Sequence, residues 1–171
     1  MKALGHLVLT VLCCTVSLAA ADPAQLVAAR ALFNTPGKSA ETQQAYEKIA
    51  AADPACAEAQ NFLAQLALRR DDADQARAYA EKAAALAPDN ADIQHTLGDA
   101  IGRSAQKASV FSQFSLAKKC LAAYQRAVAL APENAAFHQS LFDYYRNAPG
   151  IAGGGSDKAL AEAAMIKNLD A

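Results

Sequence analysis

The sequence contains no tryptophan, few aromatic residues and almost no net charge. Over 171 residues, aromatic side chains make up 6%, and 16 Lys and Arg nearly balance 17 Asp and Glu, for a formal net charge of -1. So few aromatics argue against a large β core, and the charge balance gives no reason to expect nucleic-acid binding or electrostatic attachment to a membrane. Alanine, the strongest helix former, is abundant instead. The composition predicts an all-α chain.

Long hydrophobic runs are also missing, except for one short run near the N-terminus. Residues 7–18 are mainly apolar, follow the single basic residue Lys2, and precede Ala19-Ala20-Ala21. This run is shorter than the roughly 20 residues that a membrane-spanning helix needs, and its order is that of a secretory signal peptide. We expect residues 1–21 to be cleaved after about Ala21 and the mature chain to be exported, to the periplasm. Retention as an N-terminal anchor is the alternative, and membrane contact is not otherwise expected.

Proline is sparse, and three of the six prolines close similar phrases. The phrases are Ile49-Ala-Ala-Ala-Asp-Pro54, Ala83-Ala-Ala-Leu-Ala-Pro88 and Ala127-Val-Ala-Leu-Ala-Pro132. Pro54 and Pro88 are 34 residues apart. An internal repeat of this length predicts helical hairpins that stack on one another.

Small and large residues recur at matching places within this period. The second repeat has Leu63-Ala64, Ala76, Ala80, Ala83 and Pro88; the third has Leu97-Gly98, Cys120, Tyr124, Ala127 and Pro132; the first has Phe33, Tyr46 and Pro54; the fourth has Leu141, Tyr145 and Ala159, with Ala171 where proline belongs. This pattern resembles the tetratricopeptide repeat (TPR) family, and in particular exported bacterial members with an elongated third hairpin and a Pro-Gly-x-x-Gly-Gly loop. The resemblance implies a right-handed α-solenoid of about four hairpins, with repeats over 23–56, 57–90, 91–134 and 135–171, and a binding scaffold.

The residues between the helices fit such hairpins. The prolines cannot continue a helix, and Asp89-Asn90 and Glu133-Asn134 suit a turn followed by a helix start. Asp71-Asp72-Ala-Asp74 is interpreted as the turn inside the second repeat. A calcium loop is the rival interpretation, but the segment lacks the glycine and the closing glutamate. Cys56 and Cys120 are expected as buried or half-buried thiols, because a disulfide between them would have to cross a whole repeat.

The period breaks twice. Pro88 and Pro132 are 44 residues apart, ten more than the period, and an extended third hairpin would accommodate the excess. Val110, Phe111 and Phe114 at its tip either close the hairpin against itself or, flanked by Arg103, Lys107, Lys118 and Lys119, dock a partner or a membrane surface.

The second break is the loop Asn147-Ala-Pro-Gly-Ile-Ala-Gly-Gly-Gly-Ser-Asp-Lys158. Glycine amides before a helix could bind an anion, but the nucleotide-loop order of Gly-Lys-Ser/Thr after a strand is absent. The alternative is a conformationally demanding loop with Ser156 as the N-cap.

Chemistry-bearing residues are few. His95 and His138 lack further ligands for a metal, and no nucleophile motif or acid pair predicts catalysis, so we expect no enzyme, no metal and no cofactor. The concave face of the first helices should carry the binding residues Asn61, Gln65, Arg69, His95, Asp99, Arg103, Gln139, Asp143 and Arg146. This mixed polar surface suits a peptide or a protein helix, and it lacks the Lys/Asn set with which some family members hold a C-terminal carboxylate.

The sequence thus predicts an exported scaffold that binds an unidentified protein or peptide in the cell envelope. Two alternatives remain, a small-ligand or anion-binding protein that uses the Gly-rich loop, and a non-catalytic accessory subunit of an envelope enzyme. The final helix, with Ile166 and Leu169, is expected to find a cover through self-association.

Overall fold

A computed structural model describes residues 20–169, and all regular structure within them is helical. The helices are α1 (Pro23–Phe33), α2 (Ser39–Ala52), α3 (Ala57–Arg69), α4 (Ala73–Leu86), α5 (Ala91–Lys107), α6 (Val110–Leu130), α7 (Ala135–Asn147), the short 3-10 helix η1 (Gly150–Ala152) and α8 (Ser156–Leu169). Most of the expected signal peptide and Ala171 lie outside the described residues.

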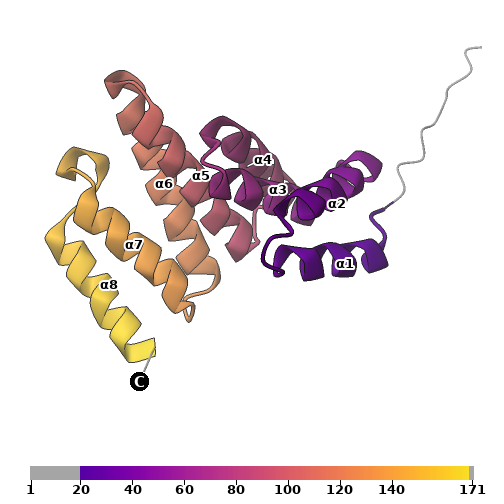
Figure 1. Ribbon diagram of the computed structural model, residues 1–171. Helices are drawn as coiled ribbons and strands as arrows, with labels where there is room; N and C mark the ends of the chain where they lie inside the picture. Colours follow the sequence, from indigo (N-terminus) through magenta and orange to yellow (C-terminus); the bar gives the residue numbers. More distant parts are fainter. Residues whose placement is uncertain (1–19, 170–171) are drawn as a thin grey trace, which may run out of the picture.

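Consecutive α-helices pair into hairpins that follow one another along the molecule (Figure 1). The pairs are α1–α2, α3–α4, α5–α6 and α7–α8, and each hairpin packs against the next. This arrangement confirms the all-α solenoid predicted from the repeats. No helix in residues 20–169 combines the length and the apolar character needed to cross a membrane.

The prolines define where the second helix of each hairpin ends. Helices α2, α4 and α6 all stop two residues before a proline of the repeat. The residues in between, Asp53, Ala87 and Ala131, have φ values of -130°, -139° and -142°, outside the helical region. The proline ring disfavours a helical conformation in the residue before it, so one residue type sets three helix ends.

Asparagine begins the following helix twice, as the sequence predicted. The Oδ1 of Asn90 accepts a hydrogen bond from the Ile93 amide at 3.1 Å, and that of Asn134 accepts one from the Ala136 amide at 3.0 Å. Both contacts satisfy an amide that has no partner within its helix. The expected turn in the second repeat is also present, with Asp72 capping α4 through the Gln75 amide at 3.1 Å.

Small side chains allow the helices to approach closely, and larger ones fill the remaining space. Ala64, Ala67, Ala76, Ala80 and Ala100 form one fully buried cluster between α3, α4 and α5. Near the N-terminal end, the fully buried Tyr46 stacks on Phe62, with ring centroids 4.7 Å apart. This division confirms the packing expected from the repeated residues.

The third hairpin is the longest. Helices α5 and α6 have 17 and 21 residues, against 13 and 14 in α3 and α4. The ten extra residues therefore lengthen both arms, as predicted. In Figure 1 the tip of this hairpin extends past its neighbours, and the α7–α8 connection lies at the same end of the array.

Candidate functional site

The first helices of hairpins one, two and three line a groove with a cavity of about 800 Å³. Its polar and charged lining residues are Arg30 from α1, Glu58, Asn61, Gln65 and Arg69 from α3, Asn90 at the start of α5, and Asp92, His95, Thr96 and Asp99 on α5. Arg30 forms two nitrogen–oxygen contacts with Glu58, so the opposite charges of this pair neutralise each other. The groove thus offers many hydrogen-bonding groups with charges of both signs.

Asn61 lies in the wall of this groove and is more buried than the sequence suggested. Its exposed fraction is only 6%, because α5 packs beside α3. Its Oδ1 has no hydrogen-bond partner within residues 20–169. A buried amide oxygen without a partner is costly, so turning the Asn61 amide toward a donor brought by a ligand would relieve that cost.

Gln65 and Arg69 also line the groove, and both contact a neighbouring hairpin. The Nε2 of Gln65 lies 3.5 Å from the Thr96 hydroxyl. The guanidinium carbon of Arg69 sits 3.9 Å from the centroid of the Phe33 ring, a cation–π arrangement. The exposed Arg69 therefore has an apolar partner but no carboxylate among the described ion pairs.

His95 and Asp99 stand one turn apart on α5, where the third and fourth hairpins meet. The Nε2 of His95 lies 2.7 Å from the Ser140 hydroxyl on α7, and its ring stacks on Phe137. Asp99 accepts a hydrogen bond from the Tyr124 hydroxyl at 2.7 Å, and its other oxygen lies 3.6 Å from Nδ1 of His95. Both predicted residues thus lie together on the inner surface.

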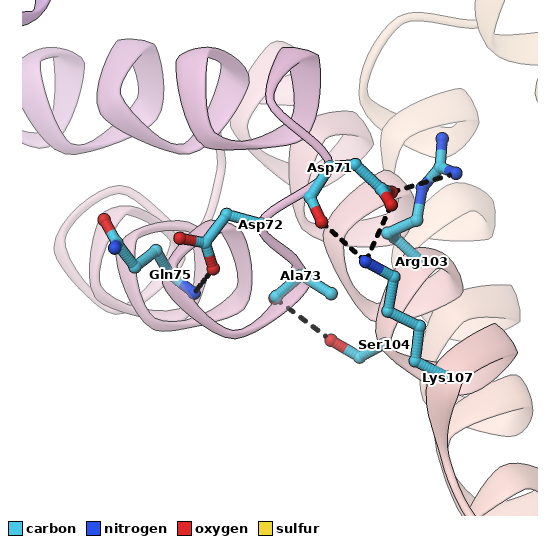
Figure 2. A network of polar contacts seen from close by, with 7 residues as sticks. All are labelled: Asp71, Asp72, Ala73, Gln75, Arg103, Ser104 and Lys107. Atoms are coloured by element: carbon cyan, nitrogen blue, oxygen red, sulfur yellow. Dashed lines mark hydrogen bonds and ion pairs between the residues drawn. The ribbon is translucent and has the colours of Figure 1, made fainter.

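Arg103, predicted for the same surface, lies elsewhere. Figure 2 shows its guanidinium beside the carboxylate of Asp71 in the α3–α4 turn, with a nitrogen–oxygen distance of 3.3 Å. Lys107 donates to the same carboxylate at 2.8 Å and to the Asp71 carbonyl at 2.6 Å. Steps of four residues rotate about 40° around a helix of 3.6 residues per turn, so Arg103 has left the face that carries His95.

This polar network fixes the α3–α4 turn against α5. Asp71 has a positive φ of 60°, a conformation that aspartate tolerates better than most residues. The hydrogen bond from Lys107 and the positive charges of Lys107 and Arg103 lower the pKa of the Asp71 carboxyl. Behind them the Ser104 hydroxyl donates to the Ala73 carbonyl at 3.2 Å (Figure 2).

The three residues predicted from the fourth hairpin contact one another. The carboxylate of Asp143 accepts from Gln139 at 3.0 Å and from Arg146 at 3.0 Å. Of the three, Asp143 alone lines a cavity of the described structure. Gln139 and Arg146 are exposed beside the inner surface.

A second cavity of about 550 Å³ opens between α5, α6, α7 and the loop after α7. Its lining residues are Asp99, Gly102, Ala105 and Gln106 of α5, Gln113, Phe114, Ala117, Cys120 and Tyr124 of α6, Ser140, Asp143, Tyr144 and Asn147 of α7, and Ala148, Pro149 and Ala152 of the loop. Asp99 lines both cavities. Most of these residues were not anticipated, although stepping from Asp99 by three and then four residues reaches Gly102 and Gln106.

Tyr144 ties the walls of this second cavity together. Its hydroxyl lies 2.8 Å from the carbonyl oxygens of Ala117 in α6 and Ala152 in η1, and its single proton can serve either. Burial, with smaller contributions from Cys120 and Tyr145, raises the pKa of Tyr144 to about 12. The neutral hydroxyl therefore links the long hairpin to the Gly-rich loop.

The two phenylalanines of the hairpin tip point to different environments. Phe111 is 96% exposed and Val110 is also exposed, so the hairpin does not close on itself there. Phe114 lies one turn further along α6 and lines the second cavity. The tip thus leaves Val110 and Phe111 in solvent, and Phe114 is itself 38% exposed.

The Gly-rich loop uses its own amides. The amides of Gly153, Gly154 and Gly155 donate to the carbonyls of Gly150, Pro149 and Tyr145 at 2.9, 3.2 and 2.9 Å. An anion would find none of these three donors free. A Cβ at Gly154 would lie 1.8 Å from the Ala148 carbonyl oxygen, so packing explains this glycine. Ser156 was expected as the N-cap of α8 but is the first helical residue, because the Gly155 carbonyl already accepts from the Ala159 amide.

The two cysteine thiols and the His138 ring are buried or half-buried among groups of the protein itself. Cys56 and Cys120 are free, half-buried and buried respectively, as predicted. The ring nitrogens of His138 lie 2.6 Å from the Glu162 carboxylate and 2.9 Å from the Pro132 carbonyl. Within residues 20–169, no three His, Cys, Asp or Glu side chains are grouped so that they could hold a metal ion.

Comparison with known proteins identifies the fold. No family model matches the sequence, and no curated protein does. Three solved structures are similar in fold: "MamA RS-1 ArsTM double mutant" (22% identity, TM-score 0.65, 83% of this chain and 71% of that one), "MamA 41-end from Desulfovibrio magneticus RS-1" (22%, 0.62, 86% and 73%) and TTC0263, a thermophilic TPR protein in Thermus thermophilus (19%, 0.70, 85% and 73%). At these identities the likeness establishes the fold, and it is the TPR fold that the repeats predicted.

Proposed function

We propose that this TPR array is an exported scaffold that binds an extended segment of a partner protein in the groove of α1, α3 and α5. The observation that carries the proposal is Asn61, a buried side chain of the groove whose Oδ1 has no partner within residues 20–169. An extended peptide presents backbone amides and carbonyls at regular intervals. A peptide amide would supply the donor that the Asn61 oxygen lacks once the side chain turns that oxygen toward the groove.

The rest of the groove supports a polypeptide ligand. Arg69 of α3 and Asp92 of α5 place side chains of both signs along the groove, beside the apolar Phe62 and Leu68. Such a surface suits main-chain hydrogen bonds with a few side-chain contacts. Because no catalytic constellation motivates chemistry, we propose that the chain acts by binding alone.

The Gly-rich loop does not favour the anion-binding alternative, since its three amides donate within the protein. An accessory subunit of an envelope enzyme would use the same groove, and the identity of the captured partner would distinguish it from a free scaffold.

The test is cross-linked capture from a periplasmic extract with wild-type protein and two variants. Asn61→Leu keeps the side-chain size and removes the amide, whereas Arg146→Ala removes an exposed charge outside both cavities. We expect one discrete partner with wild type and Arg146→Ala, and its loss with Asn61→Leu at unchanged thermal stability. Equal capture by all three proteins would refute the proposal that the partner binds in the groove.

Export is proposed from the N-terminal sequence, with its basic residue, short apolar run and three alanines. Cell fractionation followed by N-terminal sequencing of the mature protein tests it. We expect the sequence to begin near Asp22 in the periplasmic fraction, and a cytosolic protein that still begins at Met1 would contradict the proposal.

A further inference from the structure

The two breaks in the repeat period meet in space around the second cavity. Gln113 and Phe114 belong to the extension of the third hairpin, and Pro149 and Ala152 belong to the loop inserted after α7. Tyr144 holds the two segments together through the Ala117 and Ala152 carbonyls. A regular TPR hairpin of 34 residues would lack both walls, so the repeat alone does not produce this cavity.

The side-chain charge around the cavity is of one sign. Asp99 and Asp143 line it, and no Lys or Arg does. Asp143 already has the guanidinium of Arg146 at 3.0 Å. Asp99 has the Tyr124 hydroxyl at 2.7 Å and the His95 ring at 3.6 Å, and no Lys or Arg of residues 20–169 pairs with it. Of the two carboxylates, Asp99 is therefore the one without a Lys or Arg partner among the described residues.

The basic residues of the long hairpin do not pair with Asp99. Arg103 and Lys107 both pair with Asp71 instead (Figure 2). Lys118 and Lys119 are exposed and line neither cavity. Asp99 thus borders a hollow of about 550 Å³ that no Lys or Arg side chain lines.

The remaining walls suit the stem of a long basic side chain. Phe114, Tyr124 and Tyr144 contribute aromatic rings, and Ala105, Ala117 and Pro149 contribute aliphatic surface. Arg and Lys bury their methylene stems on apolar surface, and their charged heads are attracted to aromatic faces. Apolar and aromatic walls beside a carboxylate fit that combination.

We propose that the second cavity is a specificity pocket for an arginine or lysine side chain of the bound polypeptide, with Asp99 as the residue that holds the cationic head. The assignment to a polypeptide rests on the proposed function of the groove. Asp99 lines the groove and the pocket, so a peptide lying along α3 and α5 reaches the pocket with a side chain while its backbone stays near Asn61.

The pocket can be tested without knowing the partner. The probe is N-acetyl-arginine N-methylamide, titrated into isotope-labelled protein at pH 8 and followed by amide chemical shifts, with the citrulline analogue as its neutral isostere. We expect the arginine probe to shift residues of α5, α6 and the loop, and to bind about tenfold more tightly than the citrulline probe, the effect of one charged hydrogen bond. Equal affinity for the two probes, or no binding of either, would overturn the inference.

Three variants complete the test. Asp99→Asn keeps an acceptor for Tyr124 and should remove the preference for arginine, and Gln106→Trp, at an exposed lining position, should block both probes. Glu81→Gln makes the same charge change at an exposed position of α4 that lines neither cavity, so it should leave the preference intact. An unchanged preference in Asp99→Asn would refute the role of Asp99.

The experiments can refute the pocket proposal and the groove proposal separately. Asn61→Leu should abolish partner capture and leave the probe titration unchanged, because Asn61 does not line the pocket. If the groove proposal is wrong, capture is absent while the probes still discriminate, and the pocket then takes a free basic ligand. If the pocket proposal is wrong, capture persists and Asp99→Asn alters neither capture nor probe binding.

Discussion

At the scale of single residues, His138 joins the last two helices to the turn before them. Its ring nitrogens face the Glu162 carboxylate of α8 and the Pro132 carbonyl, both of which are acceptors. Only a doubly protonated ring satisfies both. In the preceding repeat the equivalent residue is Gln94, which donates to the Pro88 carbonyl at 3.0 Å. His138 thus keeps a contact of the repeat and adds a titratable one.

This geometry makes part of the stability depend on pH. Burial lowers the pKa of His138, but the Glu162 and Pro132 contacts outweigh it and leave the pKa raised above 6.5. A raised pKa in the folded state contributes stability that is complete below pH 6.5 and is lost as pH rises through the raised value.

We predict that urea unfolding will show wild type losing about 1.5 kcal/mol more than His138→Gln between pH 6 and pH 9, the size of a charged hydrogen bond. Glutamine keeps the bond to Pro132, as Gln94 does in its own repeat. Parallel pH profiles for the two proteins would contradict this role.

The two thiols should differ in reactivity. Burial, with a contribution from the Asp99 charge, raises the pKa of Cys120 to about 12. Since the thiolate is the reactive form, native protein at pH 8 should be alkylated at the half-buried Cys56 well before Cys120. Peptide mapping after iodoacetamide treatment measures this, and urea should remove the difference. Fast native labelling of Cys120 would show that the α5–α6 contact opens readily.

At the scale of the helix, the long hairpin depends on one close approach. A Cβ on Gly98 of α5 would lie 2.5 Å from two ring carbons of Tyr124 on α6. Relieving that overlap should cost about 1 to 3 kcal/mol, whereas replacing glycine in a helix returns about 1 kcal/mol. Gly98→Ala should therefore lower the free energy of unfolding in urea.

Gly102→Ala is the matched control, one turn away on the same helix. Its Cβ would meet only the Cys120 sulfur, at 3.3 Å, so its stability should stay close to that of wild type. If Gly98→Ala proved as stable as Gly102→Ala, the close helix contact would not be the reason for glycine.

The ends of the helices could be predicted from the sequence more fully than the residues of the inner face. Pro88, Pro132, Asn90 and Asn134 act on their immediate neighbours, so the helix ends could be placed from local rules. The inner face was harder, because it depends on helical phase and on which neighbour covers each residue. Asn61 is buried on α3, which packs against α5 of the next hairpin. Arg103 forms an ion pair with Asp71, which lies 32 positions earlier in the chain.

At the scale of the whole molecule, the second cavity is a product of stacking. The hairpin extension and the Gly-rich loop lie in different repeats, and each alone is a protrusion of one hairpin. They become two walls of one pocket because neighbouring repeats stack in register and place equivalent ends side by side. The sequence marked both segments as departures from the period, but their contact follows only from the arrangement of α5, α6 and α7.

The exposed side of α8 bears on whether the protein associates with itself. Among the described residues, no helix packs on the outer side of α8, where Leu160 is 68% exposed and Met165 is 43% exposed. Of the two residues expected to need a cover, Ile166 is half-buried and Leu169 is 37% exposed. A solenoid whose last repeat presents apolar side chains tends to associate through that end.

We predict that wild type dimerises weakly with rising concentration in sedimentation velocity, and that the double variant Leu160→Lys/Met165→Lys stays monomeric at equal stability. Phe111→Lys is the control, because it removes an even more exposed apolar side chain from the hairpin tip. If Phe111→Lys abolished the dimer instead, the tip would be the interface. A wild type that is monomeric at every concentration would mean that the apolar residues of α8 are too dispersed to form a contact.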